Sequence, residues 1–115
     1  MARTQSTDDL PLKPAVLHIL LALTKGELHG LGIADEAAEA SGGSVKLGPG
    51  TLYRSLDEMH AMELVEKVPL QKGSDPRRKY YRITGSGRQL LQAEMARLAR
   101  LVSYAKDRKL LPEGA

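Results

Sequence analysis

Apolar residues recur at helical spacing in three successive stretches of the first half of the chain. Between residues 12 and 23 they form a broad face, which is typical of a helix buried on most sides. A second helix is expected over residues 29–40. Gly30 and Gly32 near its start indicate a close approach to a neighbour or a constrained entry, because glycine is costly inside a helix. We expect its inner face to consist of small and aliphatic residues, namely Leu31, Ile33, Ala34, Ala37 and Ala38.

The third stretch predicts a helix over residues 49–62. Pro49 suits the first helical position, where its missing N–H costs nothing, and the preceding glycine can serve as N-cap. Leu52, Leu56 and Met59 recur at i, i+4 and i+7 and are expected to face inward. Three helices joined by short turns are typical of a helix-turn-helix fold, whose last helix reads DNA. The alternative is an ordinary surface helix that begins at a proline, and this stretch alone does not separate the two.

Two short stretches with strand-like alternation follow. Residues 64–70 and 79–84 are rich in β-branched and aromatic side chains, and a polar, turn-rich segment separates them. The pattern predicts a β-hairpin with a long basic tip, whose first strand is an edge strand because it contains Pro69. Of the neighbours Tyr80 and Tyr81, one is expected to face the core and the other to face outward. A three-helix core followed by such a hairpin is a winged helix.

A long last helix is expected to begin at Thr84 or Ser86 as N-cap and to run to about residue 109. Its apolar residues are spaced 4, 3, 4, 3, as in a coiled-coil seam: Leu91, Met95, Leu98, Val102 and Ala105. A helix this long cannot bury that face on a small domain. A second copy of the chain is the simplest cover, and the alternative is that the helix folds back as a fourth core helix.

The fold class expected is therefore mainly α with a small β-hairpin. We expect a winged helix-turn-helix DNA-binding domain at residues 10–84, followed by a long C-terminal dimerisation helix at residues 85–110.

The 115 residues include no cysteine, which excludes disulfides and thiolate metal sites and fits a reducing cytoplasm. The longest apolar run, residues 15–23, is far shorter than the roughly 20 residues that span a bilayer. Residues 1–9 lack the apolar segment of a signal peptide. We expect a cytoplasmic protein with no membrane partner.

The net charge of +3 is unevenly distributed. Residues 72–109 hold eleven basic and three acidic side chains, whereas residues 1–71 hold six basic and ten acidic ones. One end of the fold is therefore strongly basic, which indicates a polyanion such as DNA as partner. The alternative is a basic surface without a partner.

Candidate DNA-contacting residues lie on the third helix. Gly50 keeps its first turn free of bulk, and Arg54 can pair with a guanine edge or hold a phosphate. The hydroxyls of Thr51 and Tyr53 suit phosphate contacts, with the alternative that Tyr53 is a core-edge tyrosine packed on the first helix. On the hairpin, the basic candidates suit backbone and minor-groove contacts: Lys72, Arg77, Arg78 and Lys79. Since alternate residues of a strand face opposite sides, one or two of these four are expected to be merely solvated.

Catalytic and metal chemistry are not indicated. The three histidines, His18, His29 and His60, lie on separate predicted helices without the spacing of metal ligands. We expect His18 to be a satisfied core or interface histidine and His29 to cap the second helix. No Ser-His-Asp or paired-carboxylate arrangement is apparent, so neither an enzyme nor a cofactor is expected.

Three blocks of sequence resemble the PadR family of bacterial transcriptional regulators, in its short subfamily with a single C-terminal helix. They are residues 28–33 (LHGLGI), 47–56 (LGPGTLYRSL) and 77–87 (RRKYYRITGSG), and the resemblance covers about residues 12–91. It implies a dimeric winged-helix regulator, usually a repressor, that binds a pseudo-palindromic operator in double-stranded DNA. Several members are released from DNA by small phenolic or other aromatic effectors, so a small-molecule effector of unknown identity is also implied.

Two positions depart from the family pattern. The family usually has a glycine in the turn after the third helix, near Glu63, so either a non-glycine residue adopts the left-handed conformation there or the turn differs. The aromatic drug pocket known in the short subfamily depends on a tryptophan in the last helix. This chain has only Tyr104 there, so that pocket is not carried over. The function expected is a homodimeric repressor; the alternative is a winged helix that binds proteins and no specific DNA sequence.

Overall fold

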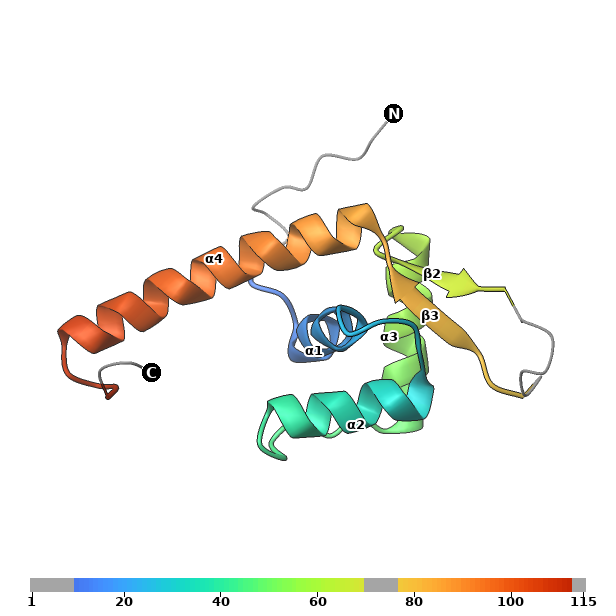
Figure 1. Ribbon diagram of the computed structural model, residues 1–115, viewed down its shortest axis with the longest axis horizontal. Helices are drawn as coiled ribbons and strands as arrows, with labels where there is room; N and C mark the ends of the chain where they lie inside the picture. Colours follow the sequence, from blue (N-terminus) through green and yellow to red (C-terminus); the bar gives the residue numbers. More distant parts are fainter. Residues whose placement is uncertain (1–9, 70–76, 113–115) are drawn as a thin grey trace.

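The computed structural model describes residues 10–69 and 77–112 (Figure 1). Its four helices are α1 (Pro14–Leu23), α2 (Gly30–Ala40), α3 (Pro49–Ala61) and α4 (Gly85–Asp107). Its three strands are β1 (Leu28–His29), β2 (Val65–Val68) and β3 (Tyr80–Ile83). The mainly α, winged helix-turn-helix fold expected from the sequence is thereby confirmed. Among the described residues, no helix has the length and apolar character needed to cross a membrane.

Helix α1 lies at the centre of the core and contacts α2, α3 and α4. The inward residues predicted for α3 are buried, with Leu52, Leu56 and Met59 between 0 and 3% exposed. The inner face predicted for α2 is only partly right. Ile33 is fully buried, but Leu31 is 65% exposed. The two differ because residues at positions i and i+2 of an α-helix lie about 200° apart around its axis, on nearly opposite sides.

The wing is part of a three-stranded antiparallel sheet in the order β1-β3-β2, rather than a two-stranded hairpin. Strand β1 was not predicted because its two residues are too few to show alternation. It pairs Leu28 with Tyr81 and His29 with Tyr80, which ties the start of α2 to the wing. Strand β2 is one of the two edge strands of this sheet, as predicted, and Pro69 follows its last residue. Tyr81 faces the core at 2% exposed, while its neighbour on the strand is only partly buried, so the prediction for this pair is confirmed.

The turn between α3 and β2 meets the start of α4. Glu63 adopts the left-handed conformation with φ of +62°, so a non-glycine residue fills the position where the family usually has glycine. The Thr84 hydroxyl donates to the Glu63 carbonyl at 2.6 Å and accepts from the Gly87 N–H at 3.0 Å. Thr84 is therefore the N-cap of α4, and it anchors the wing turn at the same time.

Only the first half of α4 packs on the core. Leu90 and Leu91 are buried, whereas the second half extends away from the other helices (Figure 1). The alternative of a complete fourth core helix is thus wrong. Glu94 is 1% exposed, and its carboxylate accepts from the Leu12 N–H at 2.8 Å and from Arg97 Nε at 2.5 Å. This buried carboxylate ties the segment before α1 to α4.

Candidate nucleic-acid interface

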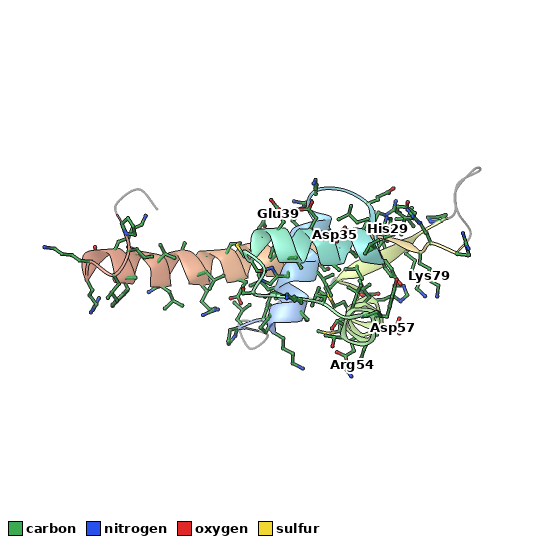
Figure 2. All side chains as sticks on the ribbon, turned by 90° about the horizontal axis from the view of Figure 1, so that it is seen from below. His29, Asp35, Glu39, Arg54, Asp57 and Lys79 are labelled. Atoms are coloured by element: carbon green, nitrogen blue, oxygen red, sulfur yellow. The ribbon has the colours of Figure 1, made fainter. Side chains whose placement is uncertain are left out.

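The outer face of α3 is centred on Arg54. The buried residues occupy one side of the helix, and at 100° per residue the opposite side carries Gly50, Arg54 and Asp57, all exposed. Figure 2 shows Arg54 projecting from α3 on the side away from α2. Thr51 is also exposed but lies at the flank of this face. Asp57 was missed by the sequence analysis, although it lies three residues after Arg54, which puts the two on the same face.

Tyr53 packs on the start of α2 rather than on α1. A Cβ added to Gly30 would lie 2.9 Å from Tyr53 Cζ and 3.3 Å from Leu52 Cδ2. The close approach predicted from the early glycines is thus confirmed at Gly30. Tyr53 remains 42% exposed, so part of its ring still faces solvent. Its phenol also lies near Tyr81, whose pKa is raised by burial first, with Asp57 and Tyr53 acting in the same direction.

His29 caps α2, as expected. Its Nδ1 accepts from the Gly32 N–H at 3.3 Å, and its ring meets Tyr80 edge to face with 5.4 Å between ring centroids. Arg78 Nη1 lies 3.3 Å from His29 Nε2. The end of the molecule where β3 meets α2 and α3 therefore carries both a histidine and a wing arginine, with Lys79 near them in Figure 2.

The basic wing residues that the structure describes are exposed at the base of the hairpin: Arg77, Arg78 and Lys79. Lys72, the fourth predicted wing residue, lies outside the described residues. A further arginine of β3, Arg82, is engaged elsewhere. It bonds Glu66 at 2.5 Å and Glu27 at 3.4 Å, and the bond to Glu66 is the main reason that its pKa is raised. Arg82 is therefore neutralised by its neighbours.

His18 is only partly accounted for by the single chain. Among the described residues, no group forms a hydrogen bond with its buried Nδ1, so the expectation of an interface histidine stays a prediction. Within residues 10–69 and 77–112, no three His, Cys, Asp or Glu side chains are grouped as metal ligands would be.

The predicted seam on α4 divides into two parts. Leu91 is 5% exposed and belongs to the core of its own chain. Beyond it, Met95 is 36% and Val102 39% exposed, while Leu98 and Ala105 are half-buried. A groove of about 690 Å³ runs along α4 on the face next to this seam. It is lined by Leu10, Ala93, Ala96, Arg97, Arg100, Leu101 and Tyr104. The described part of the chain thus leaves the distal half of α4 largely uncovered.

Residues 19–93 match a family described as the transcriptional regulator PadR-like family. A protein of Streptomyces fradiae, described as an uncharacterized 37.1 kDa protein in transposon TN4556, is 38% identical over 87 residues; the match covers 76% of this chain but only 24% of that protein. A PadR family transcription regulator from Clostridium difficile has a similar structure, with a TM-score of 0.69 and 26% identity over 86% of this chain and 100% of that one. Bacillus subtilis PadR, solved in complex with operator DNA, has a TM-score of 0.63 and 25% identity, over 72% of this chain and 47% of that one.

Proposed function

The chain belongs to the PadR-like family of transcriptional regulators, and we propose that it acts as a homodimeric repressor that binds a pseudo-palindromic operator in double-stranded DNA. In this proposal α3 enters the major groove of each half-site and the wing contacts the neighbouring minor groove. Residues 10–84 form the DNA-binding part, and residues 85–110, which contain α4, join the two chains. The protein would act in the cytoplasm, where bacterial DNA is.

The observation that carries the proposal is the position of Arg54. It is exposed at the centre of the outer face of α3, on the opposite side from the buried residues that fix this helix on the core. An arginine in that position can form two hydrogen bonds to a guanine edge, and the basic residues at the wing base supply phosphate contacts. Bacillus subtilis PadR, at 25% identity, was solved in complex with operator DNA, which supports operator binding by this chain.

The test has two steps. Duplexes that the wild-type protein binds are first selected from a random library, and the affinity of an Arg54 variant for the selected duplex is then measured. Arg54→Ala is expected to bind the selected duplex more than tenfold more weakly, since one good pair to a base is worth about 1–3 kcal/mol. Arg100→Ala is the matched control, because it removes the same charge from α4, away from α3. Equal affinity of Arg54→Ala and the wild type would remove Arg54 from the interface.

The dimer part of the proposal rests on the distal half of α4. Met95 and Val102 lie seven residues apart on one face, as in a coiled-coil seam, and both are exposed in the single chain. Val102→Glu is expected to reduce the mass in light scattering from that of two chains to that of one. Leu31→Glu is the control, because Leu31 is an equally apolar, 65% exposed residue on α2. A monomeric wild type would contradict this part.

An effector would act by favouring one angle between the two DNA-binding domains, which requires that it bind one arrangement better than the other. The groove beside Leu101 and Tyr104 is the site that we propose for it, because the groove adjoins the helix that sets this angle. Its lining is largely apolar but includes Arg97 and Arg100, which suits a small ligand that is mostly apolar and carries a negative charge. If the site is right, Leu101→Trp should abolish release of the operator by an effector found in a screen.

A further inference from the structure

His29 lies between α3 and the wing. Tyr53 of α3 packs against Gly30, the residue that follows His29. The ring of His29 contacts the ring of Tyr80 in β3. Strand β1 pairs His29 directly with Tyr80, so its position is fixed by backbone as well as side-chain contacts. We call His29, Arg78 and Tyr80 the saddle, because they connect the two parts of the proposed DNA interface.

The saddle holds more hydrogen-bond donors than acceptors. His29 Nδ1 accepts from the Gly32 N–H, and an uncharged imidazole has only one acceptor nitrogen, so its proton is on Nε2. The Arg78 guanidinium, which can only donate, lies 3.3 Å from that same Nε2. In the tautomer that caps α2, neither of these two nitrogens can accept a hydrogen bond from the other. An anionic oxygen placed beside both would satisfy both.

The geometry of B-DNA suggests the source of that oxygen. Neighbouring major and minor grooves share one sugar-phosphate strand as their common border. A protein with a helix in the major groove and a wing in the adjacent minor groove must therefore cross that strand. His29 and Arg78 lie where the start of α2 meets the wing, so in the proposed complex the shared strand would cross near them.

We propose that His29 Nε2–H and Arg78 together bind one DNA phosphate, at the border between the groove read by α3 and the groove contacted by the wing. This inference rests on the proposed function. A phosphate held there fixes the register of the protein on the duplex without reading any base. His29 thus has two functions, since one ring nitrogen caps α2 while the other binds DNA.

Two substitutions separate these functions of His29. Asparagine is a good N-cap residue whose side-chain oxygen can accept from the Gly32 N–H, but it has no donor at the ε position. His29→Asn is expected to melt like the wild type and to bind about tenfold more weakly, to the selected duplex and to a scrambled one alike. His29→Gln carries an amide N–H at the ε position but loses the cap. It should melt at a lower temperature than His29→Asn and bind more tightly.

Salt dependence distinguishes the two members of the pair. Arg78→Met removes a charge, so the slope of log K against log salt should become shallower by about 0.9. His29→Asn removes a donor that carries no charge in this tautomer, so its slope should equal that of the wild type. Arg78 is exposed, so its substitution provides a test even if a His29 variant does not fold.

The decisive experiment replaces single phosphates of the selected duplex by uncharged methylphosphonates. At one phosphate on the groove border, the methylphosphonate should lower the affinity of the wild-type protein about tenfold. The same methylphosphonate should hardly change the affinity of the doubly substituted His29→Asn, Arg78→Met protein. The inference is overturned if His29→Asn binds as tightly as the wild type, or if every methylphosphonate costs both proteins equally. Failure of the proposed function would appear earlier and separately, because the wild type would then select no duplex at all.

Discussion

The ring of Tyr53 occupies the space that a side chain at Gly30 would need. The hydroxyl group of the tyrosine lies against the glycine, and a Cβ there would be 2.9 Å from Tyr53 Cζ. Since Tyr53 is on α3 and Gly30 opens α2, the two helices approach closely at this contact. The residue before Arg54 thus helps to position α3 on α2.

Gly30→Ala should destabilise the protein, because the new methyl group must displace the Tyr53 ring. A cost of about 1–3 kcal/mol is expected from overpacking, measurable as a lower midpoint in urea unfolding. Gly32→Ala is the control in the same helix. Its Cβ would meet Leu28 Cδ2 at 3.5 Å, an ordinary contact, so this change should be neutral or stabilising by up to about 1 kcal/mol. Equal effects of the two substitutions would contradict the packing described for Tyr53.

Gly87→Ala should be destabilising for a different reason. A Cβ at Gly87 would overlap the Leu64 carbonyl oxygen and lie 3.0 Å from Ile83 Cγ1, and a backbone carbonyl within the fold cannot move aside. We expect a loss of about 1–3 kcal/mol. Gly85→Ala, two residues earlier, meets nothing within 4 Å and should cost nothing. Thermal melting of the two variants side by side tests whether α4 begins against the wing turn.

Glu63→Gly should stabilise the protein. Glu63 has a φ of +62°, which glycine adopts without the strain that a side chain brings, and the gain should be up to about 1 kcal/mol. Ala61→Gly should instead lower the stability, because Ala61 is the last residue of α3 and glycine is a poor helix former. A lower melting temperature for Glu63→Gly would show that this turn has another conformation.

Glu94 should make stability depend on pH on the acid side. The hydrogen bond from Arg97 holds the pKa of this carboxyl below its ordinary value of 4.5, although burial opposes the shift. Because the folded state binds the proton more weakly than the unfolded chain, this stabilisation is complete above the ordinary pKa and is lost as the pH falls through the lowered one. Glu94→Gln should therefore be less stable at neutral pH, by about 1–2 kcal/mol, and this difference in stability should narrow as the pH falls through the lowered pKa of Glu94. Parallel stability curves for the two proteins would contradict this explanation.

Helix α3 was largely predictable from the sequence. A proline at its first position and three leucine or methionine residues at helical spacing fixed its start and its buried side, as the burial of Leu56 confirms. The close approach at Gly30 was predictable too, because an early glycine in a helix needs a reason. Its partner Tyr53 was not, since the contact depends on how two helices pack.

Contacts that depend on strand register or on tertiary burial could not be predicted. The two residues of β1 show no periodicity, so neither the third strand nor the approach of Arg78 to His29, 49 residues away in sequence, was foreseen. Glu94 reads as one more charge on an amphipathic helix, and only the packed structure shows that it is buried against the segment at Leu12. The prediction that Leu31 faces inward was wrong. It relied on the apolar side chain of Leu31 and disregarded its position around the axis of α2, which turns it away from the core.

The measurement that tests the central proposal most directly is the affinity of the wild-type protein for duplex DNA from upstream of its own gene, compared with a scrambled duplex of the same length. The titration is run across a salt series with light scattering of the complex. The account predicts a strong preference for the upstream duplex, binding that weakens steeply with salt, and two chains for each operator. Weak binding without preference, both to this duplex and to those recovered from a library of genomic fragments, would contradict it and favour a protein partner for the basic wing.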